Sequence, residues 1–142
     1  MGRLVKQGKV NPYVRQKATS LTQHLKQKDR LGELNALFQF VRDRIRYVRD
    51  INGVETLHEP QQVLLQRHGD CDDKAVLLAS LAESIGIPTK FEALAFKPGV
   101  FSHVIVRARP YGKWVPLETT HPVKLGWYPR GVVAVMPHHN SR

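Results

Sequence analysis

The chain has 142 residues, a formal net charge of +10 and a single cysteine. This length suits one domain whose core needs no structural metal, and one cysteine excludes an internal disulfide bond. No stretch approaches the roughly 18 apolar residues of a membrane-spanning helix, and residues 1–6 lack the apolar core of a signal peptide. We therefore expect a cytoplasmic or virion-associated protein without a membrane span.

Positive charge is concentrated at the N-terminus. Residues 1–30 hold eight lysines and arginines against one acid, Asp29, and so supply +7 of the net charge. With the turn signal Asn11-Pro12, this composition predicts a loose lead-in over residues 1–17, and a short helix is expected over residues 19–28. We therefore divide the chain into a basic N-terminal segment, residues 1–30, and a folded domain, residues 31–142. The segment is either a solvated surface or a contact for an anionic or protein partner. No nucleic-acid-binding motif accompanies it, so nucleic acid is the less favoured partner.

Apolar residues at helical spacing predict the helices of the next part of the chain. One stripe covers residues 34–48, and a shorter helical segment starts at Pro60, a residue that a first helical turn accepts. The strongest pattern predicts a helix over residues 71–85, which begins after a suitable N-cap, Asp70, and ends at Gly86. This helix is apolar enough to lie at the centre of the fold.

After Pro88 the pattern changes to strands. Alternating or β-branched runs separated by turn residues predict strands over residues 91–96, 101–108, 113–118 and 131–136. Pro116 inside the third run is typical of an edge strand. Helices followed by an antiparallel meander indicate an α+β domain.

A cysteine, a histidine and a carboxylate fall at informative places in this order of elements. Cys71 begins the central helix, whose unpaired N–H groups lower a thiol pKa and can stabilise an oxyanion, whereas the acids that follow it oppose the thiolate. His103 and Glu118 lie on the two strands of a predicted hairpin. The pattern predicts Cys71 as nucleophile, with its own backbone N–H as an oxyanion donor, His103 as general base and Glu118 as the group that fixes the histidine tautomer.

Each of these residues also has a structural explanation. A free cysteine is commonly a buried apolar side chain, and a single histidine or glutamate on a strand is usually a packed or surface residue. His68, close before the cysteine, is an alternative base, although the entry to a helix gives it poor geometry. The histidines and cysteine show no metal-ligand spacing, and the acids around Cys71 fit a helix cap better than a calcium loop, so we expect no cofactor.

Four blocks of the chain carry a resemblance to a known family. They are Arg67-His68-Gly69-Asp70-Cys71-Asp72-Asp73-Lys74-Ala75-Val76-Leu77-Leu78, Gly86-Ile87-Pro88, Ser102-His103-Val104 and Trp114-Val115-Pro116-Leu117-Glu118-Thr119-Thr120. In this order, over roughly residues 33–136, they resemble the transglutaminase-like superfamily of cysteine peptidases and acyltransferases, and in particular its small bacterial and phage-type members. The resemblance implies a papain-like core and the roles of nucleophile, base and orienting carboxylate for Cys71, His103 and Glu118. The family usually has aspartate at the third position, so Glu118 is a departure by one methylene.

Three further residues are candidates for the site. A side-chain oxyanion donor should precede the nucleophile, and Gln62 is the candidate. Tyr47 and Trp114 are candidates for the wall of a substrate groove, with ordinary core or rim packing as the alternative.

Two functions of different classes follow. The first is a cysteine-dependent amide hydrolase or acyltransferase that acts on a peptide or protein substrate, with hydrolysis favoured over cross-linking by the resemblance. The second is a structural or assembly module of a bacterial or phage particle, which keeps the fold with little or no activity and docks through the basic residues 1–30.

Overall fold

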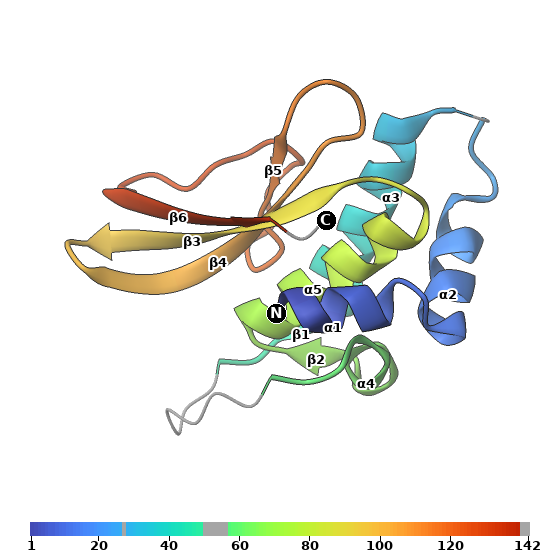
Figure 1. Ribbon diagram of the computed structural model, residues 1–142, viewed down its shortest axis with the longest axis horizontal. Coiled ribbons are helices and arrows are strands. Elements are labelled where there is room, and N and C mark those ends of the chain that lie inside the picture. The colour runs from blue at the N-terminus through green and yellow to red at the C-terminus, as the bar shows by residue number, and fades with distance from the viewer. Residues whose placement is uncertain (27, 50–56, 140–142) are drawn as a thin grey trace.

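The structure, a computed structural model, describes residues 1–26, 28–49 and 57–139. Helices dominate the first half of this part and an antiparallel sheet the second, which confirms the α+β class (Figure 1). The helices are α1 (Gly2–Gly8), α2 (Pro12–Thr22), α3 (Arg30–Arg44), α4 (Pro60–Gln66) and α5 (Cys71–Ser84). The strands are β1 (Arg46–Tyr47), β2 (His68–Gly69), β3 (Thr89–Lys97), β4 (Val100–Ala108), β5 (Val115–Leu117) and β6 (Ala134–His139).

Helix α5 is the central element of the core. All of its residues from Asp73 to Ala82 are buried, as expected for a helix that is apolar on most of its circumference. Helices α1 to α4 and strands β3 and β4 pack against it (Figure 1). The start of α5 therefore has a fixed position relative to β4, and both elements carry predicted catalytic residues.

The apolar stripe over residues 34–48 is helical only as far as Arg44. Ile45 has the extended angles φ −111° and ψ 108°, and the chain continues as β1. Ile45 is still fully buried, so its apolar character extends the pattern into a segment that is no longer helical. Val48, which the stripe also included, is exposed.

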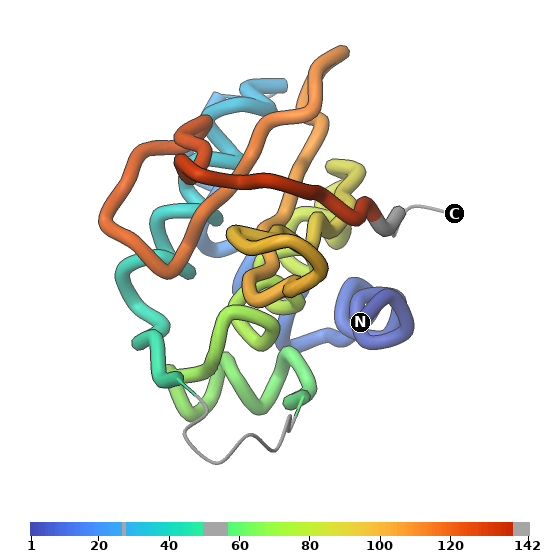
Figure 2. Tube along the Cα trace, turned by 90° about the vertical axis from the view of Figure 1, so that its left-hand side faces the viewer, coloured from blue at the N-terminus to red at the C-terminus, as the bar shows by residue number. Residues whose placement is uncertain are grey.

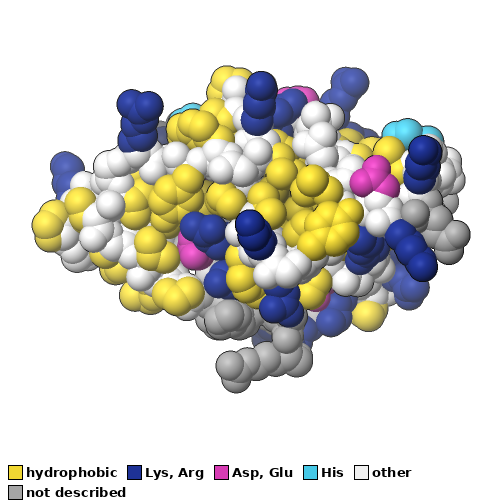
Figure 3. Space-filling view, turned by 90° about the horizontal axis from the view of Figure 1, so that it is seen from above, with side chains coloured by type: hydrophobic (Ala, Val, Ile, Leu, Met, Phe, Trp, Pro, Cys, Tyr) yellow, Lys and Arg dark blue, Asp and Glu magenta, His cyan; other side chains and the backbone are white. Residues whose placement is uncertain are grey.

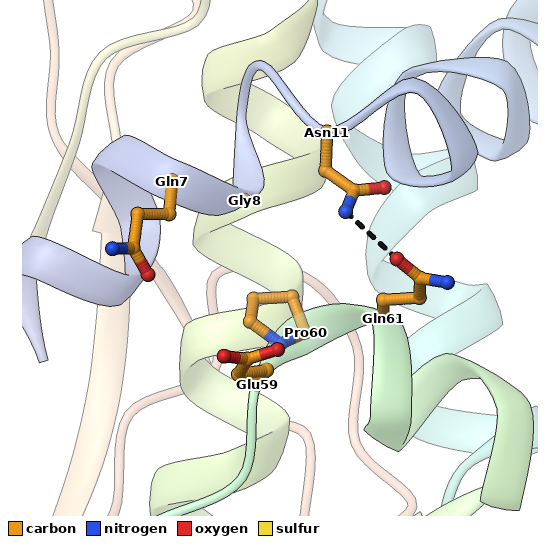
Figure 4. A pocket seen from close by; sticks show the side chains of 6 residues that line it. All are labelled: Gln7, Gly8, Asn11, Glu59, Pro60 and Gln61. Atoms are coloured by element: carbon orange, nitrogen blue, oxygen red, sulfur yellow. Dashed lines mark hydrogen bonds between the residues drawn. The ribbon is translucent and has the colours of Figure 1, made fainter.

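The expectation of a loose lead-in over residues 1–17 is wrong, and the helix expected over residues 19–28 instead begins at Pro12 and ends at Thr22. The first 22 residues are well packed. They form α1 and α2, and Val5, Val14 and Ala18 are buried in the core. The Asn11 side chain caps α2, and its amide donates to Gln61 of α4 at 2.9 Å across a small cavity (Figure 4). Only three buried apolar residues in a polar run produce this packing, which is why composition concealed it. The division of the chain at residue 30 stays a prediction.

The larger sheet has the strand order β5-β4-β3-β6, with neighbouring strands antiparallel. Figure 2 looks onto the β3–β4 turn, with β6 on one side of this hairpin and α4 and α5 on the other. Strand β5 is an edge, as Pro116 predicted. Because Leu117 pairs with Val106 on β4, Glu118 leaves the sheet close to His103.

The outer surface of the sheet is partly apolar. Seen from above, apolar side chains form much of one face of the molecule, with lysines and arginines scattered among them (Figure 3). The exposed apolar residues on or beside β3, β4 and β6 include Phe96, Val100, Phe101, Val133, Val135 and Met136.

A short parallel pair of strands completes the approach to the central helix. Strand β1 pairs with β2, so that Tyr47 lies opposite Gly69, and the N–H of Val48 donates to the Gly69 carbonyl at 2.8 Å. Gly69 is two residues before Cys71. This pairing brings the end of α3 and the start of α5 together.

We expect Gly69→Ala to lower the free energy of unfolding by about 1–3 kcal/mol. A Cβ added at Gly69 would lie 2.6 Å from the Asp73 Cβ, so the helix cap would have to move. Urea denaturation would measure the loss, with Gly112→Ala as the control, because a Cβ there has nothing within 4 Å. Equal stabilities of the two variants would contradict this role for Gly69.

Candidate active site

The acids around Cys71 form a helix cap. The Asp70 side chain accepts from the N–H of Asp73 at 2.9 Å, and the Asp73 side chain accepts from the N–H of Asp70 at 3.2 Å. Asp73 also accepts from the backbone N–H of His58 at 2.9 Å. This reciprocal capping box confirms the predicted helix start and holds Cys71 at the first position of α5. The backbone N–H of Cys71 is not one of the two donors that the box uses.

His103 and Glu118 meet as predicted. Their Nε2 and Oε2 atoms are 2.6 Å apart, and the Glu118 side chain is only 1% exposed. The other carboxylate oxygen, Oε1, accepts from the Thr120 hydroxyl at 2.7 Å and from the Thr120 N–H at 3.0 Å. The longer side chain of glutamate therefore spans the distance to His103 while both of its oxygens are bound.

These bonds define the tautomer of His103. Burial raises the pKa of Glu118, but the hydrogen bonds from His103 and Thr120 outweigh burial and leave the pKa below its ordinary value. An ionised carboxylate only accepts hydrogen bonds, so the proton lies on Nε2 of His103 and Nδ1 is left as the basic nitrogen. A histidine in this state can take a proton from a thiol.

The Cys71 sulfur lies against the strand that carries His103. The backbone of Val104, the residue after His103, lies close enough to the thiol to lower its pKa. The thiol also donates to Asp72 Oδ1 at 3.7 Å. Burial, followed by the charge of Asp72, raises the pKa of Cys71 to about 12, although the backbone of Val104 lowers it. The neighbouring acids oppose the thiolate as expected, but burial, which the sequence pattern did not include, is the largest cause, and the resting site holds a neutral thiol.

We expect Asp72→Asn to speed the alkylation of Cys71. Removing the carboxylate removes a negative charge that disfavours the thiolate, and each unit by which the pKa falls gives about tenfold more thiolate. Alkylation by iodoacetamide between pH 7 and 10, followed by intact mass, would measure the change. Glu59→Gln is the matched control, because it removes one exposed charge that makes no cap bond. Unchanged rates for Asp72→Asn would show that burial alone sets the thiol pKa.

Of the predicted groove residues, the structure brings Tyr47 to the site. Its pKa is raised by burial and then by the charges of Cys71, Asp70 and Glu118, although Arg49 acts in the opposite direction. Tyr47 is 42% exposed and lines a cavity of about 470 Å³ with Thr120. A tyrosine in this position can contact a substrate at the nucleophile.

Trp114 and Gln62 are not brought to the nucleophile in the same way. Trp114 comes directly before β5, whose first residue, Val115, pairs with Ala108 on β4. Ala108 is five residues along β4 from His103, which is a distance of roughly 16 Å. Its ring lies under Lys90 and Arg109 instead. Gln62 lies on the exposed side of α4, and its role as an oxyanion donor stays a prediction.

Three residues of the site were not predicted from the sequence. Thr120 holds Glu118, and the ring of His121 lies 6.4 Å from the ring of His103. Lys74 is only 1% exposed, and its ammonium donates to the Ile45 carbonyl at 2.7 Å. The spacing Glu-x-Thr was the available signal for Thr120, and a lysine on the apolar face of a central helix was the signal for Lys74.

The described part of the chain contains neither a metal-binding cluster nor a membrane-spanning helix. Within residues 1–26, 28–49 and 57–139, no three or more His, Cys, Asp or Glu side chains gather in a way that could hold a metal ion. In the same residues, no helix has the length and apolar character needed to cross a membrane.

Three solved structures have this fold at low sequence identity. A putative protease of Parabacteroides distasonis matches with a TM-score of 0.66 and 18% identity over 82% of this chain and 25% of its own. A putative cysteine protease of Cytophaga hutchinsonii matches with a TM-score of 0.63 and 18% identity, over 87% of this chain and 42% of its own. Calcium-bound LapG of Legionella pneumophila matches with a TM-score of 0.63 and 17% identity, over 95% of this chain and 80% of its own. The chain thus spans only a quarter and about two fifths of the first two proteins.

Sequence comparison assigns the family. A comparison with curated proteins gives no match. The family model of the transglutaminase-like superfamily matches residues 15–119, which include Cys71, His103 and Glu118 and most of the chain. The match also begins inside the basic N-terminal segment, in agreement with the packing of α2 on the core. The chain belongs to the transglutaminase-like superfamily.

Proposed function

We propose that the protein is a cysteine-dependent amide hydrolase that acts on peptides through Cys71, His103 and Glu118. The observation that carries this proposal is the 2.6 Å contact between His103 Nε2 and a buried Glu118 that Thr120 holds in place. Such an orienting carboxylate directs Nδ1 of His103 away from Glu118. The Cys71 thiol, which needs a base, lies close to the backbone of Val104, the residue after His103.

The first half of the reaction forms a thioester. The Cys71 sulfur attacks the carbonyl carbon of the substrate, and its proton passes to Nδ1 of His103. The backbone N–H of Cys71 donates to the oxyanion. His103 then gives this proton to the leaving amine, the C–N bond breaks, and the acyl group remains on sulfur.

The second half restores the thiol. Water attacks the thioester carbon and gives one proton to His103, the C–S bond breaks, and His103 returns the proton to sulfur as the acid leaves. An amine in place of water would give transfer of the acyl group. Because the resting thiol has a pKa of about 12, the proton leaves it during attack, when His103 can accept it, rather than beforehand.

A labelling experiment tests the nucleophile. We expect the full chain at pH 7 to react with a peptidyl vinyl sulfone at one site, and to cleave members of a mixed peptide library. Cys71→Ser should abolish both, and His103→Gln should reduce both without unfolding the chain. Because Cys71 is the only cysteine, labelling that persists in Cys71→Ser would refute the assignment.

The alternative is a structural or assembly module with the same fold, and the high pKa of the Cys71 thiol favours it. In this role the exposed basic residues of α1 and α2 would bind an anionic or protein partner. Deleting residues 1–30 would remove core residues, so the test is reversal of exposed charges such as Lys6→Glu and Arg15→Glu. If these variants bind a partner as the parent chain does, and the parent cleaves peptides, this alternative fails.

A further inference from the structure

A cavity of about 470 Å³ lies directly beside the catalytic groups. This volume is within the range of binding sites for small ligands. Its lining residues come from the end of α3, from β1, from the first turn of α5 and from the loop after β5: Arg42, Asp43, Ile45, Arg46, Tyr47, Lys74, Thr119, Thr120, His121 and Pro122. Neither the mechanism above nor the family match assigns a role to this cavity.

Two of the lining residues connect the cavity to the reaction. Thr120 donates two hydrogen bonds to Glu118, and the charges of Cys71 and Glu118 both raise the pKa of Tyr47. Lys74 is one helical turn beyond Cys71 on α5. The cavity therefore adjoins the loop that follows Glu118 and the first part of the helix that begins at Cys71.

The lining is positively charged. Arg42, Arg46 and Lys74 oppose the single acid Asp43, which gives +2 when His121 is neutral. The Arg42 guanidinium donates hydrogen bonds to the Asp43 carboxylate at 2.7 Å and to the Val123 carbonyl at 2.9 Å.

Lys74 and Arg46 occupy different depths of the cavity. Lys74 is buried and fixed on the Ile45 carbonyl, whereas Arg46 is exposed. The cavity thus combines a fixed cation at depth, an exposed cation and the hydroxyl-bearing residues Thr119 and Thr120.

From this charge and position we infer that the cavity binds an acidic side chain of the peptide substrate, close to the bond that is cleaved. A glutamate or aspartate carboxylate is complementary to Arg46 and Lys74, and the hydroxyl-bearing Thr119 lines the same cavity. The inference rests on the proposed function for its substrate. The binding itself needs no turnover.

Titration with two matched peptides tests the inference. The full-length Cys71→Ala variant, labelled with ¹⁵N, is titrated at pH 7 and constant ionic strength with acetyl-Ala-Glu-Ala-amide and with acetyl-Ala-Gln-Ala-amide. We expect the glutamate peptide to bind about fivefold more tightly. It should shift the backbone amides of Arg46, Tyr47 and residues 119–121.

Two arginine variants distinguish the cavity from general charge attraction. Arg46→Gln should remove the preference for the glutamate peptide, whereas Arg44→Gln, an exposed arginine outside the cavity, should keep it. Equal effects of the two variants, or equal binding of the two peptides, would overturn the inference. Failure of the vinyl sulfone to label Cys71 would refute the proposed function and leave these titrations unaffected, so the two failures are distinguishable.

Discussion

Glu118→Gln is expected to lower the rate of peptide cleavage by about 10³–10⁴-fold with little effect on folding. The glutamine carbonyl would keep the two hydrogen bonds from Thr120, so its NH₂ group would face Nε2 of His103. To avoid two opposed donors, His103 must move its proton to Nδ1. The nitrogen that should accept the thiol proton is then already protonated.

Glu118→Asp is the matched control for this prediction. It keeps the charge but withdraws the carboxylate by about 1.5 Å, one carbon–carbon bond. The side chain can then keep its bonds either to Thr120 or to His103, and we expect a loss of about 10–100-fold. Initial rates on a peptide identified from the library would measure both variants. If Glu118→Gln cleaves as fast as the parent chain, Glu118 has no part in orienting His103.

The sequence predicted the framework of the site because strong local signals define it. A capping residue before the only cysteine located the start of α5, and the hairpin after it located His103 and Glu118. The sequence showed that Glu118 is one methylene longer than the family's usual aspartate, but not that Thr120 binds one of its oxygens while the other lies 2.6 Å from His103.

What the sequence could not predict depends on contacts between distant segments. The fold buries the small apolar residues of α1 and α2 against α5, so a segment that composition marks as loose becomes part of the core. The helix start and the acids beside Cys71 were visible in the sequence, but the burial that does most to raise the thiol pKa arises only when the fold packs β4 on α5. Trp114 was chosen for its residue type, and the register of β5 places it away from the nucleophile.

Lys74 is the residue for which stability and activity should oppose each other. Burial lowers its pKa from 10.5 to about 8, although the charges of Glu118 and Asp43 act in the opposite direction. A shift of this size corresponds to roughly 3 kcal/mol against the protonated form in the folded state. The Lys74 ammonium and the Glu118 carboxylate nevertheless attract each other, and this attraction raises the pKa of the lysine. Its charge therefore costs stability and supports the site.

The sign of the pH dependence follows from this pKa. Between about pH 8 and 10.5 the folded protein holds fewer protons on Lys74 than the unfolded chain does. The contribution of Lys74 to the free energy of unfolding therefore increases as the pH rises through that range. Below pH 8 the protonated lysine is buried and the full cost remains.

We expect Lys74→Met to raise the free energy of unfolding at pH 7 by about 1–2 kcal/mol while cleavage falls about tenfold. The Ile45 carbonyl loses the hydrogen bond from Lys74, so the expected gain is smaller than the full cost of burying the charge. Cleavage falls because Glu118 loses its buried cation. Urea denaturation at pH 7 and pH 10 would measure the gain, which should disappear at pH 10, where Lys74 of the parent chain is already neutral. Lys113→Met, a change of the same charge on the exposed surface, should alter neither quantity. A Lys74→Met variant that is less stable at both pH values and fully active would show that this lysine only ties α5 to the end of α3.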